Sequence, residues 1–70
     1  MTKVKIRSKH VASVGYDSID QILEITFISG ETYHHHGVPK SAYTSLIHSE
    51  HPGYYLLSRI RNTYPYKKVV

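Results

Sequence analysis

The chain has 70 residues, with nine Lys and Arg against five Asp and Glu, so its formal net charge is +4. A chain this short forms one domain, since it buries only about 60% of its unfolded surface and supports a stability of about 3 to 5 kcal/mol. It lacks cysteine, which excludes a disulfide framework, a zinc ribbon and a thiol nucleophile. No apolar run approaches the roughly 18 residues of a membrane span. We therefore expect a cytoplasmic domain with no membrane partner.

The charge is distributed unevenly along the chain. Residues 1–10 and residues 57–70 are each basic and contain no acid, whereas residues 11–56 are acidic. The basic residues of the two ends are Lys3, Lys5, Arg7, Lys9, Arg59, Arg61, Lys67 and Lys68. The acidic residues of the middle are Asp17, Asp20, Glu24, Glu31 and Glu50.

The N-terminal cations occupy every second position from residue 3 to residue 9. In an extended conformation all four would lie on one face, in a row suited to the phosphates of a nucleic acid. The alternative is that these charges only increase the solubility of the domain. Residues 1–9 are accordingly expected to form either a basic arm or an edge strand.

Three strands are expected in the first half of the chain. Residues 11–16 are mostly apolar and end at residues 17–20, whose short polar side chains favour a turn. Residues 22–28 alternate, with Leu23, Ile25 and Phe27 on one side. Residues 31–36 return after Gly30, which completes a hairpin.

The loop of this hairpin decides which side chains face the core. A two-residue loop at residues 29–30 would pair Phe27 with Thr32 and bury polar groups. A three-residue loop at residues 29–31 pairs Phe27 with Tyr33 and is preferred because it buries fewer of them. This register pairs Ile25 with His35 and places Tyr33 and His35 against the core. It leaves Thr32, His34 and His36 on an open face beside Glu24 and Thr26.

Two short helices are expected in the second half. Pro39 suits a first helical turn, and an apolar stripe follows, which predicts a helix over residues 39–49. Pro52 interrupts it, and a second stripe predicts a helix over residues 54–62, followed by an extended tail. The expected fold class is α+β, with a three-stranded antiparallel sheet followed by two helices packed on one face.

Six short pieces occur in one order over residues 8–68. They are Val14-Gly15-Tyr16-Asp17, Leu23-x-Ile25-x-Phe27 with Gly30, Tyr33-x-His35, Val38-Pro39 with Tyr43, Gly53 with Tyr55, and Ile60-Arg61-x-x-Tyr64-Pro65-Tyr66. In this pattern the chain resembles the KTSC domain, which also occurs at the C-terminus of some lysyl-tRNA synthetases and as small bacterial and phage proteins.

The resemblance implies a single KTSC-like domain over residues 1–70 that acts as a binding module, with RNA as a suggested ligand. This sequence departs from the family pattern at three places. His35 stands where the family has a second tyrosine, His51 replaces a serine before the second helix, and Leu57 replaces an asparagine inside it. Any role of the replaced side chains is therefore in doubt here.

Histidines and tyrosines are abundant, with six and seven copies. His34 and His36, at i and i+2, could share a metal ion only if a third ligand such as His10 or His48 joined them. That spacing is weak evidence, so we expect no metal and no cofactor. Tyr16, Tyr33, Tyr43 and Tyr55 are read as residues at the edge of the core. Arg61 is expected to pair with Asp17 or Glu24, or else to bind an anion.

The predicted function is non-catalytic, because no motif for a nucleophile, a phosphate loop or a carboxylate pair is present. We expect the two basic ends to converge and bind RNA or another polyanion, with Tyr64 and Tyr66 stacking on bases. A second possibility is a protein-interaction module, either a homodimer or a monomer that binds a host protein. A third is a pocket for a small anion such as a nucleotide, formed by Tyr33, His35 and Arg61.

Overall fold

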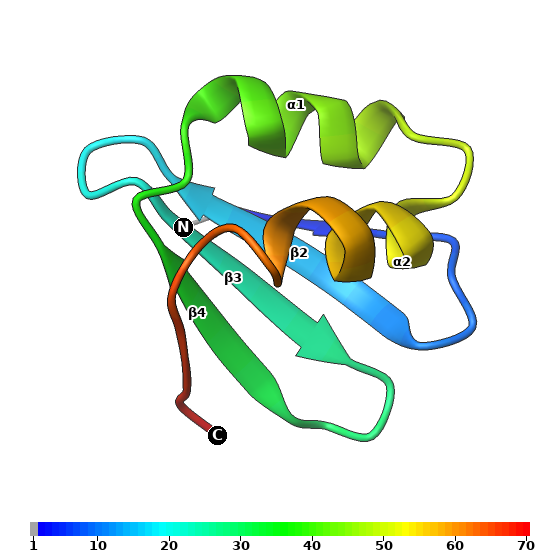
Figure 1. Cartoon of the computed structure of the whole chain (residues 1–70). Helices are drawn as coiled ribbons and strands as arrows, with labels where there is room; N and C mark the ends of the chain where they lie inside the picture. The colour runs from blue at the N-terminus through cyan, green and yellow to red at the C-terminus, as the bar shows by residue number, and fades with distance from the viewer. Residues whose placement is uncertain (1) are drawn as a thin grey trace.

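The computed structural model describes residues 2–70 and shows one antiparallel sheet with the helices on one face (Figure 1). The elements are β1 (Lys3–Lys5), β2 (Val11–Asp17), β3 (Ile22–Phe27), β4 (Thr32–His36), α1 (Lys40–His48), α2 (Pro52–Tyr55), the π-helical segment η1 (Leu56–Ile60) and β5 (Tyr66–Lys68). The fold class is α+β as predicted. The predicted strand number was wrong, because the sheet has five strands in the order β1-β2-β3-β4-β5.

The three central strands form where the apolar alternation predicts them. Leu23 and Ile25 point to the helix-covered face and are fully buried. The turn before β3 is held by Asp17, whose Oδ1 accepts hydrogen bonds from the backbone N–H groups of Ile19 and Asp20 at 3.0 and 3.2 Å. This is the role expected of a short acidic side chain at a turn.

The register of the β3–β4 hairpin differs from the prediction by two residues. Ile25 pairs with Tyr33, not with His35, because the loop comprises residues 28–30 rather than 29–31. Gly30 has a φ of 98°, a conformation that favours glycine and lets the loop close one residue earlier. A shift of two residues leaves every side chain on its predicted face. Tyr33 and His35 therefore face the helices, as predicted.

The helices cover the sheet through a small apolar core. α1 and the α2–η1 segment lie over the same face (Figure 1). The buried apolar residues are Val11, Val14, Leu23, Ile25, Val38, Leu46, Leu56 and Ile60. No helix within residues 2–70 has the length and apolar character needed to span a membrane.

The second helix begins at Pro52, two residues earlier than predicted, because proline fits a first helical turn. It then widens into η1, where the N–H of Arg61 bonds to the carbonyl of Leu56 at 2.8 Å. This bond spans five residues, as in a π-helix, and π-helical turns are frequent at functional sites. Leu56 is buried beneath the turn, and Arg61 follows at its exposed end.

The two terminal segments occupy opposite edges of the sheet. β1 pairs with β2, and β5 pairs with β4. With neighbouring strands about 4.8 Å apart, four spacings separate these edges by about 19 Å. The expectation that the two ends converge was therefore wrong. Residues 3–5 form an edge strand, and of the predicted segment 1–9 only Met1 lies outside the described residues.

Candidate functional site

A cavity of about 310 Å³ opens between the sheet and η1. Tyr33, His35 and Arg61, the three residues predicted to form an anion pocket, all line it. The other lining residues are His10, Phe27, Ile28, Ser29, Glu31, Leu56, Leu57 and Tyr66. Its volume lies at the lower end of the range for small-molecule sites.

Arg61 is the cation of this cavity. Its guanidinium carbon lies 5.4 Å from the centre of the Tyr66 ring, within the range of a cation–π interaction. The predicted ion pair with Asp17 or Glu24 is not formed, and no carboxylate within residues 2–70 lies within 4.0 Å of the guanidinium. The five N–H donors of Arg61 therefore have no carboxylate acceptor, which leaves them free to bind an anion.

Aromatic rings form the floor and one wall of the cavity. Tyr33 lies edge-on to Phe27 and to Tyr66, with ring centres 5.7 and 5.8 Å apart. The rings of His35 and Tyr66 are 5.3 Å apart. Tyr33 and Tyr66 reach the same place because β4 and β5 are neighbours, with Tyr66 paired to His35. A flat aromatic ligand would find ring faces and edges on which to pack.

His35 is the buried polar residue of the cavity, with an exposed fraction of only 3%. Its Nδ1 has no hydrogen-bond partner within residues 2–70. Burial, reinforced by the nearby charge of Arg61, lowers the pKa of the imidazole from 6.5 to about 4. His35 is therefore neutral at pH 7, with one ring nitrogen as donor and the other as acceptor.

An ion pair lies at the hairpin end of the cavity. The carboxylate of Glu31 is 2.9 Å from the Nζ of Lys68. This contact lowers the pKa of Glu31 and raises that of Lys68. Since Lys68 compensates the charge of Glu31, the charge of Arg61 makes the cavity net positive.

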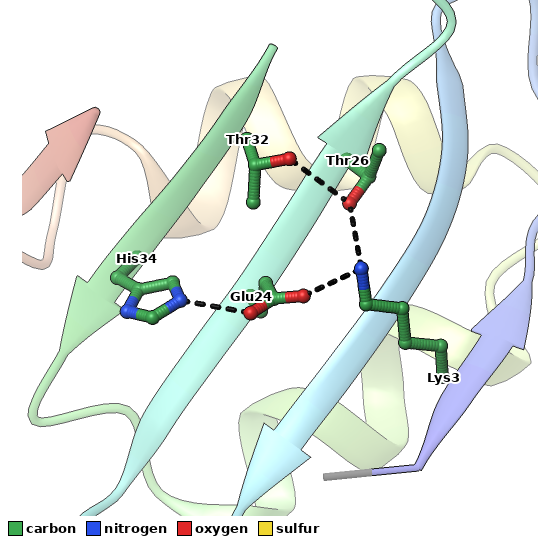
Figure 2. A network of polar contacts seen from close by, with 5 residues as sticks. All are labelled: Lys3, Glu24, Thr26, Thr32 and His34. Atoms are coloured by element: carbon green, nitrogen blue, oxygen red, sulfur yellow. Dashed lines mark hydrogen bonds and ion pairs between the residues drawn. The ribbon is translucent and has the colours of Figure 1, made fainter. Parts of the chain in front are cut away.

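The opposite face of the sheet carries a polar network (Figure 2). The carboxylate of Glu24 is 2.8 Å from the Nζ of Lys3 and 2.8 Å from the Nε2 of His34. Lys3 also donates to the hydroxyl of Thr26 at 3.5 Å. These contacts, that with Lys3 foremost, lower the pKa of Glu24. The network fastens β1 to the sheet, and it neutralises one of the predicted nucleic-acid contacts.

The predicted row of four N-terminal cations does not form. Lys3 and Lys5 pair with Gly15 and Ser13 of β2 and lie on the open face. The chain then turns, so that Arg7 and Lys9 line a second cavity on the helix side. The row is broken because only residues 3–5 remain in the strand.

The C-terminal residues predicted to bind nucleic acid also lie on different parts of the surface. Arg61 and Tyr66 line the first cavity, whereas Lys67 pairs with His34 and lies on the open face. Tyr64 packs against the core, and Arg59 is exposed on η1 without lining either cavity.

The histidines considered for metal binding are separated. His34 and His36 share the open face, whereas His10 lines the first cavity, and His48 is bonded to its own helix through the Thr44 carbonyl at 2.9 Å. Residues 2–70 contain no group of three or more His, Asp or Glu side chains placed to hold a metal ion.

Comparison with known proteins places this arrangement in a family. The model of the KTSC domain matches residues 7–64, which is most of the chain. The chain belongs to the KTSC domain family. It is 36% identical over 53 residues to an uncharacterised protein of Stutzerimonas stutzeri, a match that covers 76% of this chain and 75% of that protein.

A solved KTSC structure has the same fold as this chain. The crystal structure of a KTSC domain protein from Yersinia pestis superimposes with a TM-score of 0.93 at 26% identity, over 99% of this chain and 97% of that one. The three positions at which the sequence was expected to depart from the family pattern all line the cavities. His35 lines the first cavity, His51 the second, and Leu57 both.

Sequence reasoning missed much of the cavity wall. Phe27 and Leu56 belong to the core, as their apolar patterns predict, and also line the cavity, whereas the sequence suggested His10 only as a metal ligand. Tyr66 was assigned to nucleic-acid stacking by the C-terminal cations, with no sign that it meets Tyr33. The pairing of Tyr66 with His35 brings its ring to the cavity. Residues 64–68 are too few for their alternation to predict that strand.

Proposed function

We propose that this KTSC domain is a non-catalytic cytoplasmic module that binds a nucleotide in the cavity between β4, β5 and η1. The observation that carries the proposal is the position of Arg61. Among the residues that the structure describes it has no carboxylate partner, and its guanidinium carbon lies 5.4 Å from the centre of the Tyr66 ring, beside the buried His35. A nucleotide combines the two features that this site can recognise, a flat base and a phosphate.

Each part of the ligand has a matching group in the cavity. The phosphate would take charge-assisted hydrogen bonds from the planar fork of Arg61. The base would pack on Tyr33 or Tyr66, as bases do on aromatic platforms. The neutral imidazole of His35 lines the same cavity and would lie beside the base.

The protein-interaction alternative has weaker support. The two edge strands, β1 and β5, are each only three residues long and contain two lysines each. Short, lysine-rich edges oppose the addition of a strand from another chain. The open face is also polar, with Lys3, Glu24 and His34 bound to one another. We therefore rank a homodimer or a host-protein complex below the nucleotide site.

The proposal predicts that nucleoside monophosphates stabilise the domain against heat more than their parts do. At a concentration one hundred times the dissociation constant, a bound ligand adds about 2.7 kcal/mol to the free energy of unfolding. Thermal unfolding should be followed with each of the four nucleoside monophosphates, with the matching nucleosides and with inorganic phosphate. A nucleotide is expected to raise the unfolding temperature more than its nucleoside and phosphate together. The same unfolding temperature in every sample, with each ligand at millimolar concentration, would reject the proposal.

A further inference from the structure

A second cavity, of about 440 Å³, adjoins the nucleotide site. It shares His10 and Leu57 with the first cavity, so the two hollows meet at these side chains. One wall is the segment between β1 and β2, residues 7–10, and the other is the start of the second helix, residues 50–54.

A close contact holds the two walls together. A Cβ built on Gly53 would lie 2.8 Å from the Oγ of Ser8, so glycine is what allows this approach. That same Oγ accepts hydrogen bonds from the backbone N–H groups of His10 and Val11 at 3.2 and 3.4 Å. The loop that carries Arg7 and Lys9 is thus fastened to its own backbone and lies against the helix.

The second cavity carries an excess of positive charge. Arg7 and Lys9 line it, and neither is within 4.0 Å of a carboxylate of residues 2–70. Glu50 is the acid of the lining. Tyr54 is 74% exposed there, an unusual position for a ring of this size. Two free cations beside an exposed ring match the requirements for a further nucleotide of a single strand.

We propose that the two cavities hold successive nucleotides of one single-stranded nucleic acid. This inference rests on the proposed function and names its ligand as a strand rather than a free mononucleotide. One base lies against Tyr33 with its phosphate on Arg61, the strand passes His10 and Leu57, and the neighbouring phosphates contact Arg7 and Lys9. The open face of the sheet, with Lys5 and Lys67, takes no part.

The test compares the affinity of strands of one, two and four nucleotides, in RNA and DNA form, by calorimetry at several salt concentrations. The affinity is expected to rise at least tenfold from one nucleotide to four. In the double variant Arg7→Ala/Lys9→Ala the mononucleotide affinity should not change, and the gain with length should disappear. The slope of log K against log salt for the tetranucleotide should fall by about 1.4, since each phosphate contact on a single strand contributes about 0.7.

The matched control is Lys5→Ala/Lys67→Ala, which removes two cations from the open face and is expected to leave both affinities unchanged. A mononucleotide that binds with no gain on lengthening would overturn this inference and leave the proposed function standing. A gain lost in the control variant but kept in Arg7→Ala/Lys9→Ala would place the strand on the open face and also overturn it. Failure of both mononucleotides and strands to bind would overturn the two proposals together.

Discussion

Arg61→Ala is expected to lower the affinity for a nucleoside monophosphate by about 10- to 100-fold. Hydrogen bonds to a charged group contribute about 1.5 to 3 kcal/mol each, and 1.4 kcal/mol corresponds to a factor of ten. The variant should still fold, because the side chain of Arg61 is exposed, forms no ion pair within residues 2–70 and loses only its cation–π contact with Tyr66. Affinities measured by calorimetry, with unfolding curves on the same samples, would check both statements.

Two variants show whether the loss belongs to this guanidinium. Arg59→Ala removes an exposed cation from η1 that lines neither cavity, so the affinity should stay at the parent value. Arg61→Lys keeps the charge but not the planar fork, so it should recover only part of the affinity. An equal loss in Arg59→Ala would show that the ligand responds to overall charge, and the cavity would then not be the site.

Acidification from pH 6.5 to about pH 4 is expected to lower the free energy of unfolding through His35. The pKa of this imidazole is about 4 in the folded protein and 6.5 as its ordinary value. Between these values the unfolded chain binds a proton that the folded chain excludes, so stability falls as the pH falls. At 1.36 kcal/mol per pH unit the loss approaches about 3 kcal/mol.

A loss of this size is comparable with the whole stability of a domain of about 70 residues, so the protein should be largely unfolded near pH 4. Glu24 and Glu31, whose pKa values are lowered, add a further loss at the acid end of this range. The contribution of His35 is isolated by His35→Leu, measured by urea unfolding at intervals of pH. The variant should lose much less stability between pH 6.5 and 4.5. The same slope as in the parent would contradict the assignment, as would an NMR titration of the His35 ring with a pKa near 6.5.

The faces of the central strands could be predicted from the sequence because alternation carries that information directly. Leu23, Ile25 and Phe27 alternate along the strand, and whichever even register shift the hairpin takes, they stay on one face with Tyr33 and His35. The register itself could not be predicted. It depends on the positive φ of Gly30 within a loop whose other residues permit several lengths.

The edge strand Tyr66–Lys68 could not be predicted, and an edge strand at residues 1–9 was only one of two alternatives, for a different reason. Lys3–Lys5 and Tyr66–Lys68 have no buried residue, so neither presents an apolar face that a pattern could reveal. Each becomes a strand by pairing with a neighbour distant in sequence or across a turn. Missing the strand at residues 66–68 hid Tyr66 from the site, and without the strand order the termini were wrongly expected to converge.

Part of the candidate site was nevertheless accessible from the sequence. Tyr33 and His35 follow from strand alternation, and Arg61 from its place after the second apolar stripe, and all three line one cavity. The π-helical turn over Leu56–Ile60, which precedes Arg61, could not be predicted from the sequence. An α-helical and a π-helical turn share the same apolar stripe. The second cavity depends on contact between residues 7–10 and 50–54, which no local pattern encodes.

The most direct measurement is a titration of the isotope-labelled protein with a nucleoside monophosphate and then with a tetranucleotide, followed by amide and side-chain NMR shifts. The mononucleotide should move the signals of Tyr33, His35, Arg61 and Tyr66, and the tetranucleotide should add those of Arg7, Lys9 and Tyr54. Shifts confined to Lys5, His34, His36 and Lys67, on the open face of the sheet, would contradict the account.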